Sequence, residues 1–149
     1  MNPTLLNLVL ADDDMDDCIF FKEALEELPH VTELKIVNNG VALMRLLSEG
    51  VEPLPHALYL DLNMPLKTGF ECLLEIKHSE KLKHLPVIIF STSFNPEVVK
   101  SLREHGAAHY IRKPGDFSDL KSIISQSLDL LTVDNAQPTA KNFVLNSKQ

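Results

Sequence analysis

A chain of 149 residues is most simply one domain, and its formal net charge of −7 gives DNA or RNA little electrostatic reason to bind it directly. No stretch approaches the ~20 apolar residues of a membrane span, and the N-terminus lacks the basic-then-apolar order of a signal peptide. The two cysteines form no CxxC pair, which favours a reducing compartment. We therefore expect a cytoplasmic protein that contacts neither membranes nor nucleic acid directly.

Five segments with the character of strands alternate with five segments of helical spacing. Strands are expected over residues 5–11, 33–37, 57–60, 87–90 and 108–112. Apolar residues recur three and four apart in the segments where we expect helices, residues 16–28, 41–47, 69–77, 95–105 and 117–131. Short loops and right-handed crossovers then imply an α/β fold, a doubly wound (βα)5 arrangement with helices on both faces of a parallel sheet.

The predicted domain covers residues 1–131, and residues 132–149 are expected to form a polar C-terminal tail. Within the tail, only Phe143, Val144 and Leu145 could anchor it to a surface. This composition favours a flexible segment over a second domain, with a neighbouring subunit as one candidate for holding it in place.

The central predicted strand, residues 57–60, runs directly into Asp61. Its continuous apolar character is typical of a strand buried on both faces of a parallel sheet, and Pro65 ends any further pairing. Asp61 would then lie at the carboxyl end of an interior strand, where open α/β sheets bind their ligands. A carboxylate is costly to bury there unless something compensates its charge. The alternative is that Asp61 caps the following turn, as Asp commonly does.

Four of the five predicted strands end in side chains that suit one chemistry: Asp12 with Asp13, then Asp61, Ser91 and Lys113. Three carboxylates at one edge of a sheet repel one another and raise at least one pKa unless a cation intervenes. Oxygen ligands without His or Cys suit Mg2+. A metal, a carboxylate nucleophile, a hydroxyl and an ammonium together make a phosphoryl-transfer site, in which the metal and Lys113 neutralise the phosphoryl oxygens.

Two other groups of residues fit a purely structural interpretation. Asp16 and Asp17 suit the solvated first turn of a helix, where acidic side chains are favoured electrostatically. His105 and His109 are four residues apart, but Gly106 ends the helix between them, so we expect no metal site there.

From about Leu5 to Leu131 the chain resembles the receiver domains of two-component response regulators. The similarity rests on Ala11-Asp12-Asp13, on Leu60-Asp61-Leu62-Asn63-Met64-Pro65 with Gly69, on Ser91, and on Tyr110-Ile111-Arg112-Lys113-Pro114. It implies a flavodoxin-like fold with the five-stranded parallel sheet in the order 2-1-3-4-5. Gly115 departs from the family, which often has a bulky residue at this position.

The resemblance also implies a role for each matched residue at the predicted site. Asp61 would be the phosphoacceptor. Asp12, Asp13, Asp61 and the backbone carbonyl of Asn63 would hold Mg2+, and Lys113 would contact the phosphoryl group.

Two further matched residues would form the switch. The Ser91 hydroxyl would move toward a phosphoryl oxygen, and Tyr110 would rotate inward behind it. Such a switch needs a preference of a few kcal/mol between two states, which about one or two charge-assisted hydrogen bonds can supply.

By the same resemblance the chain is a signalling domain rather than an enzyme, with intrinsic self-phosphorylation and slow autodephosphorylation. A sensor histidine kinase or a histidine phosphotransfer protein would donate the phosphoryl group. An output partner would bind the face made by the fourth helix, the fifth strand and the fifth helix. The sequence leaves open whether a homodimer forms through the last strand and the tail.

Two alternatives from other classes remain at this point. A phosphatase of the haloacid dehalogenase type also uses a strand-end aspartate with magnesium, but it needs a second acid two residues later, where this chain has Asn63, and a cap region for which there is no room. A degenerate interaction module on the same fold would be favoured if an acid or Lys113 were missing, and all of them are present.

Overall fold

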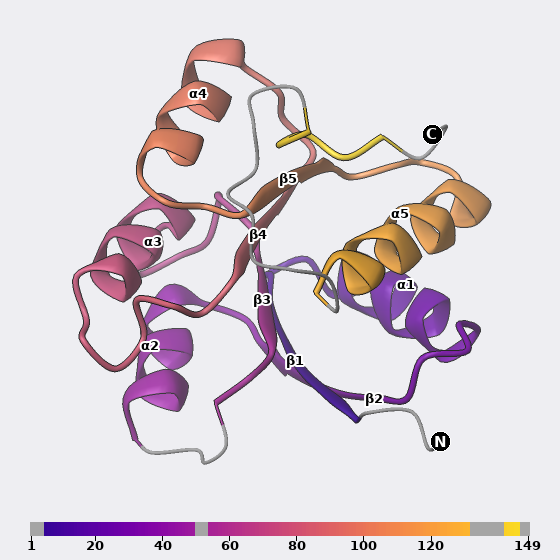
Figure 1. Cartoon of the computed structure of the whole chain (residues 1–149), viewed down its shortest axis with the longest axis horizontal. Helices are drawn as coiled ribbons and strands as arrows, with labels where there is room; N and C mark the ends of the chain where they lie inside the picture. Colours follow the sequence, from indigo (N-terminus) through magenta and orange to yellow (C-terminus); the bar gives the residue numbers. More distant parts are fainter. Residues whose placement is uncertain (1–4, 50–53, 132–141, 147–149) are drawn as a thin grey trace.

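The computed structural model describes residues 5–49, 54–131 and 142–146, and Figure 1 shows a sheet covered on both faces by helices. The strands are β1 (Leu6–Ala11), β2 (Thr32–Val37), β3 (Ala57–Leu60), β4 (Val87–Ser91) and β5 (His109–Arg112). The helices are α1 (Met15–Glu26), α2 (Gly40–Ser48), α3 (Gly69–Lys77), α4 (Pro96–Glu104) and α5 (Phe117–Leu130). The strands pair in parallel in the order β2-β1-β3-β4-β5, which confirms the predicted doubly wound (βα)5 fold.

The sheet separates two hydrophobic cores. Helices α2, α3 and α4 cover one face, and α1 and α5 cover the other (Figure 1). Because side chains alternate along a strand, Leu58 points into the core under α2–α4, whereas its neighbour Tyr59 points into the core under α1 and α5. Both β3 and β4 are buried along their whole length, as expected for interior strands of a parallel sheet.

Tyr59 is the largest polar side chain in the core under α1 and α5, and its hydroxyl has a hydrogen-bond partner. The Tyr59 hydroxyl lies 2.6 Å from Oγ of Ser127, and Ser127 donates its single proton to the carbonyl of Ile124 at 2.7 Å. Tyr59 is therefore the donor in the first contact. The Tyr59 ring packs edge-on against Phe21, with ring centroids 4.9 Å apart. This arrangement fixes α5 and α1 against the strand that carries Asp61.

Each helix begins at a side chain that accepts hydrogen bonds from the first turn, as the sequence chemistry of helix starts requires. The capping residues are Asp14, Asn39, Thr68, Asn95 and Asp116. Among the helices of the described residues, none is long and apolar enough to cross a membrane.

A short C-terminal segment, residues 142–146, lies along the outer edge of β5 (Figure 1). The Tyr110 N–H donates to the Phe143 carbonyl at 3.0 Å, and the Leu145 N–H donates to the Tyr110 carbonyl at 2.9 Å. Phe143 is only 1% exposed and Leu145 is 6% exposed. This piece of the predicted polar tail thus packs on its own chain, and the remainder of the tail, residues 132–141 and 147–149, falls outside the described residues.

Replacing Phe143 by Ala is expected to detach this segment. Truncating a fully buried Phe costs about 3–5 kcal/mol, more than the two backbone hydrogen bonds to Tyr110 can retain at about 1 kcal/mol each. Hydrogen exchange at the Leu145 and Tyr110 amides should accelerate more than tenfold. Val144→Ala is the matched control, because Val144 is only partly buried. Unchanged protection in Phe143→Ala would contradict this packing.

Candidate functional site

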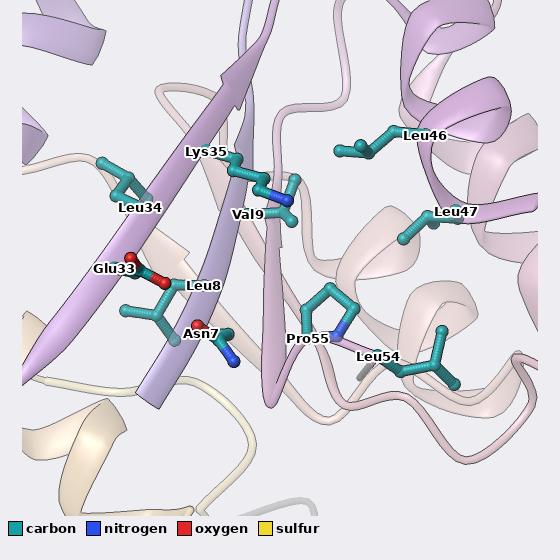
Figure 2. A pocket seen from close by; sticks show the side chains of 10 residues that line it. All are labelled: Asn7, Leu8, Val9, Glu33, Leu34, Lys35, Leu46, Leu47, Leu54 and Pro55. Carbon is teal, nitrogen blue, oxygen red and sulfur yellow. The ribbon is translucent and has the colours of Figure 1, made fainter. Parts of the chain in front are cut away.

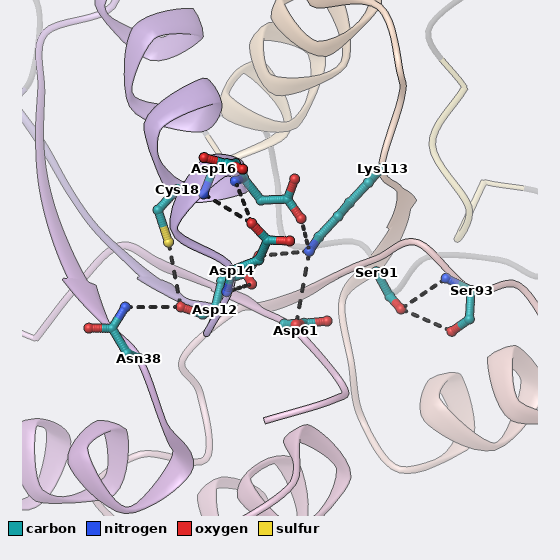
Figure 3. Close-up of polar contacts among 10 residues, drawn as sticks. Asp12, Asp14, Asp16, Cys18, Asn38, Asp61, Ser91, Ser93 and Lys113 are labelled. Carbon is teal, nitrogen blue, oxygen red and sulfur yellow. Dashed lines mark hydrogen bonds and ion pairs between the residues drawn. The ribbon is translucent and has the colours of Figure 1, made fainter. Parts of the chain in front are cut away.

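The strand ends bring the predicted site residues to one edge of the sheet (Figure 3). The backbone hydrogen bonds between neighbouring strands continue one residue past the strand ends. The N–H of Asp12 donates to the Val37 carbonyl at 3.0 Å, that of Asp61 to the Ala11 carbonyl at 2.9 Å, and that of Lys113 to the Ser91 carbonyl at 2.8 Å. Each of these three residues is therefore held by the neighbouring strand rather than by a free loop.

Three carboxylates form the acidic part of the site. Ligand oxygens of Asp12, Asp13 and Asp61 all lie within 4.8 Å of one another. Asp12 is fully buried and Asp61 is 6% exposed, whereas Asp13 faces solvent. Oδ1 of Asp12 accepts the Asp14 N–H at 3.0 Å, and its buried Oδ2 faces the Lys113 ammonium at 2.7 Å. Three converging carboxylates form an all-oxygen donor set, which fits a hard divalent cation.

The ammonium of Lys113 lies among these carboxylates. Its Nζ is 2.7 Å from Oδ2 of Asp12, 2.8 Å from Oδ2 of Asp17 and 3.9 Å from Oδ2 of Asp61. The pair with Asp12 is close without hydrogen-bond geometry, whereas Asp17 accepts a hydrogen bond. Burial works to lower the pKa of Lys113, but the carboxylates of Asp12 and Asp17 outweigh it and raise the pKa. Lys113 therefore stays charged.

The electrostatics of Asp61 differ from those of an ordinary surface carboxylate. Burial raises the pKa of Asp61 to about 7; Lys113 opposes this shift and Asp12 adds to it. A backbone hydrogen bond from Asn63 also favours the ionised form. One ammonium does not balance the charges gathered here, so a bound cation would favour the ionised form of Asp61.

Ser91 and Tyr110 both contact Ser93. The Ser91 side chain is fully buried, and its Oγ lies 3.0 Å from Oγ of Ser93 and accepts the Ser93 N–H at 3.2 Å (Figure 3). Tyr110 is buried, donates a hydrogen bond from its hydroxyl to the Ser93 carbonyl, and packs edge-on against Phe94. Ser93 therefore links the residue predicted to sense the phosphoryl group to the residue predicted to respond.

Asp17 is the site residue that the sequence analysis missed. The cap of α1 is Asp14, whose Oδ1 accepts the N–H groups of Asp16 at 3.0 Å and of Asp17 at 3.1 Å. Asp17 precedes the buried Phe21 by four residues, so it lies on the helix face that packs on the sheet. That spacing was the available signal. An acid in line with the core-facing residues of a helix is directed inward, toward Lys113.

The loop after β3 is fitted closely to the strand end that carries Asp61. A Cβ atom on Gly69 would come within 2.2 Å of the Asp61 carbonyl, and one on Gly40 within 2.2 Å of the Lys67 carbonyl. The Gly69 N–H donates to the Leu62 carbonyl at 3.0 Å. Glycine is therefore required at both positions, because the neighbouring backbone occupies the space that a side chain would need.

The pocket in Figure 2 is separate from this site. It has a volume of about 350 Å3 and is lined by residues that include Asn7, Glu33 and Pro55, which lie at the starts of β1, β2 and β3. In a parallel sheet the starts and the ends of strands are at opposite edges, so the pocket is remote from the acidic cluster. Leu54, another lining residue, is adjacent to residues that are not described.

The chain belongs to the family described as the response regulator receiver domain, whose model matches residues 8–125. It is 33% identical over 121 residues to the response regulator Rcp1 of Synechocystis sp. (strain ATCC 27184 / PCC 6803 / Kazusa), covering 78% of this chain and 82% of that protein. The chain is thus a receiver domain of two-component signal transduction. Family membership confirms the resemblance inferred from the sequence and decides against the haloacid dehalogenase-type phosphatase.

Two solved structures show the same fold. The Mn2+-bound form of Rcp1 has a TM-score of 0.76 and 30% identity, covering 90% of this chain and 99% of that one. The phosphorylated cyanobacterial phytochrome response regulator RcpA has a TM-score of 0.79 and 28% identity, covering 91% of this chain and 100% of that one. The flavodoxin-like receiver architecture is therefore confirmed across nearly the whole described chain.

Gly69→Ala is expected to displace the backbone at Asp61. The new methyl group would meet the Asp61 carbonyl, which is backbone and cannot turn away as a side chain would. We expect the phosphorylation rate with acetyl phosphate to fall by at least tenfold, because small misplacements of reacting groups are costly. Gly115→Ala is the control, since a Cβ there meets nothing within 4 Å. Equal loss in both variants would contradict the assignment of close packing to Gly69.

A second prediction concerns pH and the metal-free protein. The pKa of Asp61 is raised from 3.8 to about 7 on folding, so between these values the folded state binds more protons and stability falls as pH rises. In the presence of a chelator, Asp61→Asn should therefore be more stable than the native chain at pH 8, on the order of 3 kcal/mol. The gain should vanish near pH 4. Thermal unfolding at both pH values measures it, and a gain independent of pH would contradict the raised pKa.

Proposed function

We propose that Asp61 is the phosphoacceptor of this receiver and that Asp12, Asp13, Lys113 and Ser91 complete its site. The observation that carries the proposal is the convergence of three carboxylates and one ammonium at the carboxyl ends of β1, β3 and β5. A sensor histidine kinase or a histidine phosphotransfer protein, the usual donors for receiver domains, supplies the phosphoryl group.

The acidic cluster is proposed to hold Mg2+. Asp12, Asp13 and Asp61 provide carboxylate oxygens, and the backbone carbonyl of Asn63 is the further ligand. The convergence of three carboxylates around a single ammonium supports this assignment, as does the existence of a Mn2+-bound form of the relative Rcp1. The cation supplies charge neutralisation for the phosphoryl oxygens and favours the ionised form of Asp61.

The residues of the chain itself perform the transfer. An oxygen of ionised Asp61 forms a bond to phosphorus while the bond from phosphorus to the donor histidine nitrogen breaks, and that nitrogen keeps the electron pair. Lys113, 3.9 Å from Oδ2 of Asp61, is placed to neutralise the phosphoryl oxygens as charge spreads over them. The phosphorylated structure of RcpA shows that a relative with this fold carries the modification.

The switch is proposed to pass from Ser91 to Tyr110. The Ser91 hydroxyl exchanges its contact with Ser93 for a charge-assisted hydrogen bond to a phosphoryl oxygen. Since Tyr110 is bound to the carbonyl of Ser93, movement there changes the surroundings of the Tyr110 ring. This change alters the face formed by α4, β5 and α5.

That face is the proposed binding surface for an output partner. Phe94 is 41% exposed and Val98 is 43% exposed, so apolar surface is available at the start of α4. A second copy of the chain is an alternative occupant of this surface. We assign the chain a signalling role with self-phosphorylation from small donors and slow autodephosphorylation, rather than turnover of a metabolite. A cytoplasmic location is supported by the two cysteines, which are both free and buried.

The test is incubation with acetyl phosphate, with and without Mg2+, followed by intact-mass measurement. We expect a single magnesium-dependent, alkali-labile phosphoryl adduct that is lost in Asp61→Asn, because the amide is not a nucleophile toward phosphorus. An acid-stable adduct that persists in this variant would overturn the assignment of Asp61. Absence of any adduct while Mg2+ binds would favour a degenerate interaction module, and steady hydrolysis of unrelated phosphate esters would contradict the signalling role.

A further inference from the structure

Lys113 has one carboxylate partner that does not belong to the acidic trio. Asp17 accepts a hydrogen bond from Nζ at 2.8 Å, whereas Asp12, Asp13 and Asp61 form the group whose oxygens converge on a cation site. Asp17 comes from α1 and the trio from the ends of β1 and β3. The lysine is therefore shared between two sets of carboxylates with different positions in the fold.

The backbone of Asp17 is fixed independently of the lysine. Its N–H is held by the cap residue Asp14, and four residues later Phe21 is buried in the core between α1 and the sheet. The Asp17 side chain is 32% exposed, so water can solvate it without a bound cation. Asp17 can therefore stay in place whatever occupies the acidic trio.

Cation binding and phosphorylation change the partners of Lys113. Once Asp12 and Asp61 face a cation and a phosphoryl group, their charge is no longer available to hold the ammonium. Asp17 is then the carboxylate that remains with it. A lysine has a flexible four-carbon stem, and without Asp17 its Nζ would either spread over several rotamers or stay with Asp12, which it already contacts at 2.7 Å. The second outcome sets the ammonium in competition with the cation.

We propose that Asp17 is a positioning residue that shares the Lys113 ammonium with the cation ligand Asp12, keeps it directed at the phosphoryl oxygens, and so frees Asp12 for the cation. This inference rests on the proposed phosphoryl transfer to Asp61. Asp17 contacts neither donor nor cation and acts only through Lys113. This positioning has two expected consequences: phosphoryl transfer is faster, and the divalent cation binds more tightly.

The first arm of the test measures the rate of phosphorylation by acetyl phosphate at saturating Mg2+. Asp17→Asn should lower the maximal rate about tenfold without changing the half-saturating donor concentration, because Lys113 still carries its charge but is less well placed. Asp17→Glu should recover most of the rate. Asp16→Asn is the matched control: it removes the same charge from the same helix turn, and Asp16 is exposed. Asp17→Ser provides a second variant, should Asp17→Asn fold poorly.

The second arm measures Mg2+ affinity by calorimetry, without any phosphoryl donor. Asp17→Asn should weaken binding about three- to tenfold in the native chain. In a Lys113→Met background the same substitution should change the affinity by less than about twofold, because a double-mutant cycle isolates effects that pass through the lysine. An equal effect in both backgrounds would mean that Asp17 acts through the electrostatic field alone, and it would overturn the proposal.

The outcomes separate this inference from the proposed function. If the native chain forms no adduct on Asp61, the proposed function fails whatever Asp17 does. If the native chain is phosphorylated and Asp17→Asn matches it or is faster, only the inference fails. A faster variant would show that Asp17 withdraws Lys113 from the phosphoryl group instead of presenting it.

Discussion

The constraint on which the site depends is an imbalance of charge at one edge of the sheet. Asp12 and Asp61 are buried carboxylates beside a third at Asp13, and a single ammonium from Lys113 is set among them. Such a cluster is unfavourable by itself, because burial penalises each charge and like charges repel. The same imbalance makes the edge receptive to a cation and keeps Asp61 responsive to what binds. The surrounding fold supplies the rigidity that prevents these side chains from separating.

Much of this arrangement could be predicted from the chain sequence, because it depends on the order of elements. Apolar runs that end in Asp12, Asp61, Ser91 and Lys113 put these residues at one edge as soon as the sheet is parallel. The start of α4 was equally accessible, since Asn95 followed by Pro96 is a local signal of a helix start. Strand ends and caps are thus predictable because they depend on neighbours along the chain.

Other features depend on contacts between distant parts of the chain and were not accessible in this way. The contact of Asp17 with Lys113 joins residues 96 positions apart, so the spacing within α1 could indicate the inward direction of Asp17 but not its partner. The hydrogen bonds between Tyr110 and residues 143–145 join positions more than thirty residues apart, and no periodic pattern in the sequence predicts them. Leu66 adopts a left-handed backbone, at φ 71°, where glycine is the usual choice. Leu66 adopts this strained backbone conformation because the chain must turn from Asp61 back to α3 within a few residues.

The pairing of residues 142–146 with β5 has a consequence for how molecules of this kind meet one another. An open sheet presents unpaired N–H and C=O groups along its first and last strands, and strands of other molecules can add there. Here the last strand is paired at Tyr110 by the chain's own segment. The strand at the other border of the sheet, β2, exposes the charged side chains Glu33 and Lys35, which disfavour pairing with an uncharged strand. The N–H and C=O groups of Tyr110 are thereby occupied, so a strand of another molecule cannot pair with them, while the acidic edge remains open to its donor.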